Sequence, residues 1–205
     1  MSIYALKGHF QDLLRPAVHG LYRIGITANT VTVAAAVVSL LVAAAVWCCA
    51  PTQPLLYLAL PLWMLLRMAL NAVDGMLARE FGQQSRLGAY LNELCDVIAD
   101  AALYLSLLSV PGVRAEALWL LAWAAALSEY AGVLGLMVGA SRRYDGPMGK
   151  SDRAFVIGVL GLLLAFGWGG AMTVSGVAAA MAMLCGVTMV NRVRRGLKES
   201  AVSPQ

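Results

Sequence analysis

The sequence predicts an all-α polytopic membrane protein with six transmembrane helices and an N-terminal interfacial amphipathic helix. Of its 205 residues, 60% are hydrophobic and only 13% are charged, whereas soluble domains carry about 25% charged residues. A membrane helix needs about 20 mostly apolar residues, so the chain has room for about six of them and short loops. No length is left for a second domain.

The segment 1–26 carries apolar residues at helical spacing, with polar and charged residues between them. We expect a helix in the membrane interface, although a helix docked on the bundle fits the same pattern. A six-span domain at 27–198 and a polar tail at 199–205 follow, and the residues from Arg194 onward are expected to fray. The predicted spans are Thr30–Ala50, Leu55–Arg79, Leu87–Val110, Ala115–Ala140, Arg153–Gly167 and Gly170–Val193.

Helix-breaking residues separate these spans. Pro51 and Pro54 end the first, Pro111 follows the third, and Gly146 and Pro147 interrupt a polar loop before the fifth.

The basic residues predict the orientation of the chain. Thirteen of its fifteen lysines and arginines lie in or at the edge of the N-terminal segment, the 2–3 connection, the 4–5 loop or the tail, and Arg67 and Arg114 are the exceptions. The positive-inside rule then places both termini in the cytoplasm. We expect an integral protein of a bacterial inner membrane whose basic residues contact anionic lipids, with no nucleic-acid partner.

A cluster of polar residues marks the cytoplasmic side of spans two and three. Asn71, Asp74, Gly75 and Ala78 share one helical face of the second span. Acidic residues in a span are costly, so they are normally paired, hydrated or bound to metal.

The third span carries the matching stripe, with Gly88, Asn92, Asp96 and Asp100 each four residues apart. We expect the two spans to be antiparallel neighbours that converge on one pocket. Carboxylate and amide oxygens suit Mg²⁺ or Mn²⁺. Interhelical hydrogen bonding and a proton relay are the alternatives.

This stretch resembles the signature of the CDP-alcohol phosphotransferase family, D-x2-D-G-x2-A-R-x8-G-x3-D-x3-D. Six of the eight fixed positions match, and Asn71 and Asn92 stand where the family has Asp. Residues 25–32, which include Asn29, are similar to the stretch that leads into the family's first span. Residues 146–153 are similar to its glycine-rich basic segment before the fifth span.

The resemblance implies a transferase that moves a substituted phosphate from a CDP-linked alcohol to an acceptor hydroxyl and releases CMP. It implies one or two divalent ions held by Asp74 and Asp96 with Asn71 and Asn92, and Asp96 as the general base; Asp100, on the same helical face as Asp96, is a further candidate ligand. The implied nucleotide-binding residues are Asn29, Asp74, Gly75, Ala78, Arg79 and Gly88. Homodimers also occur in the family.

The two asparagines leave the motif with two carboxylates where the family has four. We expect Glu93 or Asp100 to supply the missing charge, or a single tightly bound ion. Loss of catalysis, leaving a lipid- or nucleotide-binding homologue, is the alternative from another functional class.

The acceptor is predicted from the remaining basic residues. The expected donor is CDP-diacylglycerol, and the expected acceptor is a small polar alcohol. Arg142, Arg143, Lys150 and Arg153 suit a phosphorylated one, with glycerol 3-phosphate as the best candidate. CDP-choline or CDP-ethanolamine with a lipid acceptor is the alternative. Glu129 is a further candidate for the pocket wall, but interhelical bonding explains it equally well.

Overall fold

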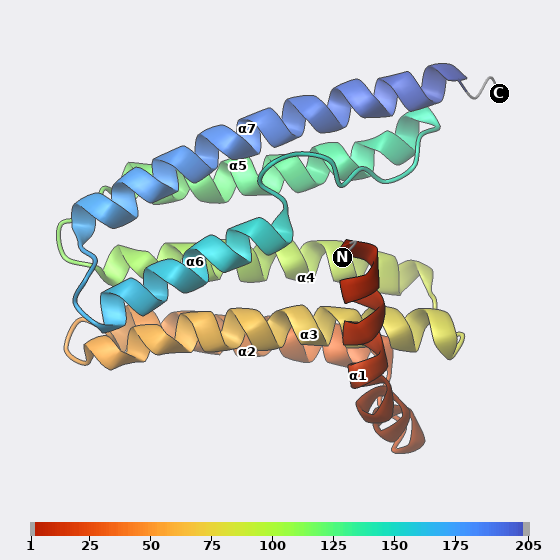
Figure 1. Cartoon of the computed structure of the whole chain (residues 1–205), viewed down its shortest axis with the longest axis horizontal. Helices are drawn as coiled ribbons and strands as arrows, with labels where there is room; N and C mark the ends of the chain where they lie inside the picture. Colours follow the sequence, from red (N-terminus) through yellow and green to blue (C-terminus); the bar gives the residue numbers. More distant parts are fainter. Residues whose placement is uncertain (1–2, 203–205) are drawn as a thin grey trace.

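A computed structural model describes the backbone of residues 3–202 and the side chains of residues 10–201, and this part of the chain is helical throughout apart from its connections (Figure 1). The long helices are α1 Ile3–Arg23, α2 Ala28–Cys49, α3 Ala59–Glu80, α4 Arg86–Leu105, α5 Ala115–Leu134, α6 Lys150–Ala165 and α7 Ala171–Val202. Three short 3₁₀ helices, Pro54–Leu58, Ser106–Ser109 and Gly135–Val138, extend the ends of their neighbours.

Helix α2 is the centre of one half of the bundle, because it packs along both α3 and α4. The backbones of α3 and α4 approach each other at few points, but Arg67 of α3 pairs with Asp96 and Asp100 of α4. The two spans run antiparallel (Figure 1), and their polar stripes line one space, as expected.

The other half is built outward from these helices: α6 packs on α3, α5 on α4, and α7 on α5. The α3–α4 connection, the segment 139–149 and the C-terminus lie at the same end of the bundle (Figure 1). The segment 139–149 then turns inward, so that α6 begins part-way along the bundle. Basic regions that are distant in sequence are thereby gathered at one end.

Four helical segments are long and apolar enough to cross a membrane: Ala28–Cys49, Pro54–Glu80, Ala115–Val138 and Ala171–Ala201. Helix α4 carries Glu93, Asp96 and Asp100, and α6 has only 16 residues. These two helices account for the difference from the predicted six spans, and the count of six is not confirmed.

Helices α1 and α7 bear on two expectations: the position of the N-terminal helix in the membrane interface and the fraying of the tail. Helix α1 lies across the end of the long helices (Figure 1), with Val18 buried against Val73, Met76 and Leu77. Ile3 and Leu6, the first apolar residues of the helical pattern in segment 1–26, lie outside the residues whose side chains the structure describes. Helix α7 continues to Val202, so residues 194–202, which were expected to fray, are helical.

Candidate active site

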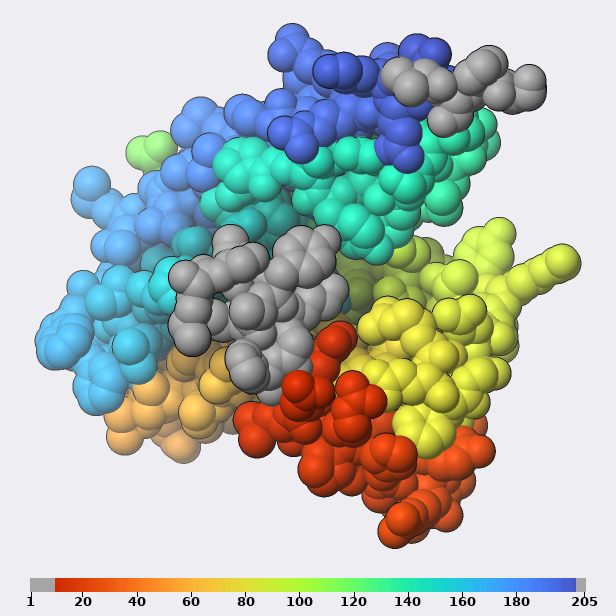
Figure 2. Space-filling view, turned by 45° about the vertical axis from the view of Figure 1, so that its right-hand side comes forward, coloured from red at the N-terminus to blue at the C-terminus, as the bar shows by residue number. Residues whose placement is uncertain are grey.

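A cavity of about 900 Å³ opens between α3 and α4, within the size range of ligand sites. The surface is hollowed between the segment near residue 140 and the α3–α4 connection (Figure 2). The lining residues are Ala28, Asn29, Thr32, Asn71, Asp74, Gly75, Ala78, Arg79, Gln83, Gln84, Ser85, Arg86, Gly88, Ala89, Tyr90, Asn92, Glu93, Val133, Leu136 and Arg142.

Two helix N-termini border the cavity and are fixed by side-chain caps. Thr27 Oγ1 accepts from the Thr30 amide at 3.2 Å at the start of α2, and Ser85 Oγ accepts from the Gly88 amide at 2.9 Å at the start of α4. Gln83 Oε1 accepts from the Ala28 amide at 2.7 Å. The bond between Ala28 and Gln83 joins the α3–α4 connection to α2, and helix N-termini favour anionic ligands.

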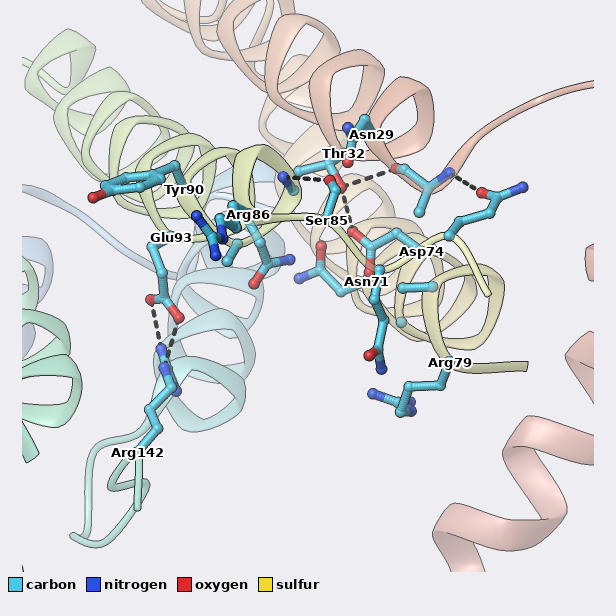
Figure 3. A pocket seen from close by; sticks show the side chains of 18 of the residues that line it. Asn29, Thr32, Asn71, Asp74, Arg79, Ser85, Arg86, Tyr90, Glu93 and Arg142 are labelled. Carbon is cyan, nitrogen blue, oxygen red and sulfur yellow. Dashed lines mark hydrogen bonds and ion pairs between the residues drawn. The ribbon is translucent and has the colours of Figure 1, made fainter. Parts of the chain in front are cut away.

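Asp74 is a carboxylate on the cavity wall with only 4% of its surface exposed. The Thr32 hydroxyl of α2 donates to its Oδ2 at 2.8 Å (Figure 3). No cation pairs with Asp74 among the described residues. An unpaired buried carboxylate is expensive, so this position favours a bound cation.

Gly75 and Gly88 make room for polar side chains. A Cβ at Gly75 would lie 3.1 Å from Nη2 of Arg79, and a Cβ at Gly88 would lie 2.7 Å from Oδ1 of Asn29. The two glycines thus let Arg79 fold back over α3 and Asn29 approach α4. Gly75 with Arg79, and Gly88 with Asn29, are thus neighbouring pairs, and all four residues were predicted to bind the nucleotide.

Nine of the fourteen predicted site residues line the cavity, and five do not. The nine are Asn29, Asn71, Asp74, Gly75, Ala78, Arg79, Gly88, Asn92 and Arg142. The other five, which lie elsewhere, are Asp96, Asp100, Arg143, Lys150 and Arg153.

Asp96 and Asp100 lie further along α4 and are bonded to cations. Asp96 pairs with Lys150 of α6 and, at 3.1 Å, with Arg67 of α3. Asp100 pairs with Arg67 and Arg153, and the Tyr104 hydroxyl donates to it at 2.9 Å. The carboxylate of Asp100 is therefore not available to replace a motif aspartate.

Glu93 is not available either. Its Oε2 accepts from Nη2 of Arg142 at 2.6 Å across the mouth of the cavity (Figure 3). The hypothesis that Glu93 or Asp100 compensates for the two asparagines is not supported, because arginines already neutralise both.

The predicted acceptor-binding cations are paired as well. Arg143 binds Asp145 at 2.7 Å and also Glu199, and so fastens the segment after α5 to α7. Burial disfavours the charged form of Asp145, but hydrogen bonds from Arg143 and Arg195 outweigh it and hold the pKa of this carboxyl below its usual value. Arg153 is fully buried. The expectation that Arg143 and Arg153 face an acceptor is wrong in this arrangement.

Sequence patterns gave no role to three residues that the structure makes prominent. Thr32 supports Asp74, Arg67 joins Asp96 to Asp100, and Arg192 of α7 contacts Glu129 at 3.1 Å. Arg67 had a usable signal, since an arginine within a span must find partners. Glu129 joins α5 to α6 and α7 through Arg153 and Arg192, which is the interhelical bonding expected as the alternative to a place in the pocket wall.

The donor set fits one divalent ion better than two. Asp74 shares the cavity with Asn71 and Asn92, whose amide oxygens are acceptable Mg²⁺ or Mn²⁺ ligands. Among the described side chains, residues 10–201, no group of three or more acidic, histidine or cysteine residues could hold a metal ion. Asn71 and Asn92 stand where the family motif has Asp, so the site carries two fewer negative charges. Two negative charges are what one divalent ion neutralises.

The sequence matches the family model for CDP-alcohol phosphatidyltransferases over residues 25–190. The chain belongs to the CDP-alcohol phosphatidyltransferase family. It is therefore a transferase of phospholipid biosynthesis, as the motif implied, and the loss of catalysis is not supported.

Relatives agree with this membership. The chain is 48% identical over 165 residues to the inner membrane protein YnbA of Escherichia coli, covering 80% of this chain and 81% of that protein. It is 32% identical over 102 residues to the phosphatidylinositol phosphate synthase of Mycobacterium tuberculosis, covering 50% of this chain and 45% of that protein. An integral membrane location follows from the apolar helices and the first relative.

Solved structures share the fold. The M. tuberculosis phosphatidylinositol phosphate synthase in complex with manganese and citrate superimposes with a TM-score of 0.71 at 21% identity, covering 93% of this chain and 91% of that one. The same enzyme with CDP-DAG bound gives a TM-score of 0.69 at 22% identity, covering 92% and 94%.

Proposed function

We propose that this enzyme transfers the phosphatidyl group of CDP-diacylglycerol to a small polar alcohol and releases CMP. The cavity between α3 and α4 is the proposed site. The observation that carries the proposal is the convergence of Asn29, Asn71, Asp74, Arg79 and Asn92 on this one cavity.

The unpaired charges suit a nucleotide diphosphate. Arg79 and Arg86 line the cavity (Figure 3), and no carboxylate pairs with either in the described part of the chain. Arginine is well matched to phosphate oxygens. These groups would position the diphosphate at the cytoplasmic end of the helices.

Asp74, with the amide oxygens of Asn71 and Asn92, would hold a divalent cation, Mg²⁺ or Mn²⁺. Such an ion supplies charge stabilisation to the diphosphate when bound. Thr32 orients the Asp74 carboxylate toward the cavity by its hydrogen bond. The ligand set then presents one carboxylate and neutral oxygens, which supports a single ion.

Asp96 remains the proposed base. It lies one helical turn beyond Asn92 on α4, and Lys150 and Arg67 fix its orientation. In the proposed step Asp96 takes the proton of the acceptor hydroxyl, whose oxygen bonds to the phosphorus next to the diacylglycerol. The bond from that phosphorus to the bridging oxygen breaks, and CMP leaves with the electron pair.

The proposed topology keeps six membrane spans, both termini in the cytoplasm and an interfacial α1. Its support is the shared end of the basic segments (Figure 1) and the exposed apolar side chains of α1, such as Leu13 at 77%. A homodimer is part of the proposal by family resemblance, and the mass of the detergent-solubilised protein tests it.

The test is CMP release by purified enzyme from CDP-diacylglycerol, with Mn²⁺ and a panel of alcohols that includes glycerol 3-phosphate. We expect an alcohol-dependent lipid product and its loss in Asp96→Asn. Asp152→Asn, an exposed change near the start of α6, is the matched control. CMP release that persists in Asp96→Asn would contradict the role of Asp96.

A further inference from the structure

A site for an anion is built into the bundle beside the cavity, and the protein fills it with its own carboxylate. Arg153 of α6, Arg192 of α7 and Arg142 of the 139–149 segment converge on Glu129 of α5. Their nitrogens lie 2.8, 3.1 and 3.4 Å from its carboxylate oxygens. Three converging arginines would otherwise suit a phosphate.

Two of the three arginines, Arg153 and Arg192, have no guanidinium nitrogen left for a ligand. Every guanidinium nitrogen of Arg153 already has an acceptor, from Tyr104, Ser128, Met148, Asp100 and Glu129. Arg192 is 2% exposed and also donates to the carbonyl oxygens of Ser128 and Asp145. The adjacent void measures about 10 Å³, room for roughly one water molecule. A phosphate could enter only by displacing Glu129.

Arg79 and Arg86 are the arginines of the cavity lining without an ion-pair partner among the described residues. The two phosphates of the donor account for both.

We infer that the acceptor alcohol of this enzyme carries no phosphate group, and that Glu129 is the residue that sets this specificity. The inference rests on the proposed transferase function and narrows its substrate class. Glu129 acts by occupying the arginines that a phosphate would need, without touching the reacting atoms. It is a positioning residue, and its effect must appear as a difference between two acceptors.

The test uses acceptor pairs that differ only in a phosphate: glycerol with glycerol 3-phosphate, and inositol with inositol 1-phosphate. For the pair that yields lipid product, the wild-type enzyme should give a kcat/KM at least about tenfold higher for the member without phosphate. In Glu129→Gln this ratio should fall at least about tenfold, through a lower KM for the phosphorylated member. Glu116→Gln makes the same change at an exposed position of the same helix and should leave the ratio unaltered.

The outcomes separate the two claims. No CMP release with any alcohol overturns the proposed function, and the inference with it. CMP release that favours the phosphorylated member of a pair overturns only the inference. An unchanged ratio in a folded Glu129→Gln variant overturns the role of Glu129. Should that variant not fold, competition in the wild-type enzyme decides: glycerol 3-phosphate must not compete with the preferred alcohol, and competitive inhibition refutes the proposal.

Discussion

The two polar regions of this membrane protein lie side by side but differ in how their charges are satisfied. In the cavity between α3 and α4, Asp74, Arg79 and Arg86 have no ion-pair partner among the described residues. In the buried network beside it, which joins Arg67, Asp100, Arg153, Glu129 and Arg192, each charge is paired across helices. Unpaired charges indicate where a ligand binds, and paired charges indicate what holds the bundle together.

The largest expected effect is on the network. Arg153→Gln leaves Asp100 and Glu129 without their shared partner inside the bundle. Removing one member of a buried ion pair costs about 3–5 kcal/mol, so the free energy of unfolding should fall by about that amount. Unfolding in detergent by denaturant measures it.

Arg195→Gln is the control for this prediction, because Arg195 pairs with Asp145 at 2.7 Å while 67% of its side chain is exposed. An exposed pair contributes about 0–1 kcal/mol. Equal losses of unfolding free energy in the two variants would mean that the buried ion pairs of the network are no stronger than an exposed pair.

The cavity should respond in function and not in stability. Asp74→Asn removes the one unpaired carboxylate of the predicted cation site, so CMP release should fall at least about 100-fold. Binding of Mn²⁺, followed by its paramagnetic resonance signal, should be lost in parallel. Asp12→Asn, with 68% of its side chain exposed, is the control, and Mn²⁺ affinity that survives in Asp74→Asn would contradict the assignment.

The sequence predicted the positions of the helices and nine of the twenty residues that line the cavity, because both depend on local periodicity and on one contiguous motif. It did not predict that α2 packs along both α3 and α4. It also did not predict that Asp100, Arg153 and Glu93 are neutralised. Those outcomes depend on contacts such as Arg67 with Asp100 and Arg192 with Glu129, which join residues that are distant in sequence.

A smaller effect, on CDP affinity, should distinguish Arg79, which has no ion-pair partner among the described residues, from Arg142, which is paired with Glu93. Arg79→Gln should weaken CDP binding about tenfold, the loss of one charge-assisted hydrogen bond of about 1.5 kcal/mol. Arg142→Gln should weaken it less, since Arg142 is held by Glu93. Calorimetric titration with CDP and Mn²⁺ measures both, and a larger loss in Arg142→Gln would reverse the assignment of free and paired charges.

The smallest effect concerns the backbone beneath Arg79. A Cβ at Gly75 would meet the flexible end of Arg79 at 3.1 Å, so Gly75→Ala should displace the guanidinium at little cost in stability. CDP affinity should fall a few-fold. Gly186→Ala in α7, where a Cβ meets nothing within 4 Å, should leave it unchanged. A loss in Gly186→Ala as large as in Gly75→Ala would remove the explanation.

The most direct measurement is an experimental structure of the enzyme with Mn²⁺ and CDP, with the anomalous signal of manganese used to locate the ion. The account predicts one manganese ion against Asp74, with the diphosphate between it and Arg79. Manganese held between Asp96 and Asp100, or a nucleotide bound outside the α3–α4 cavity, would contradict it.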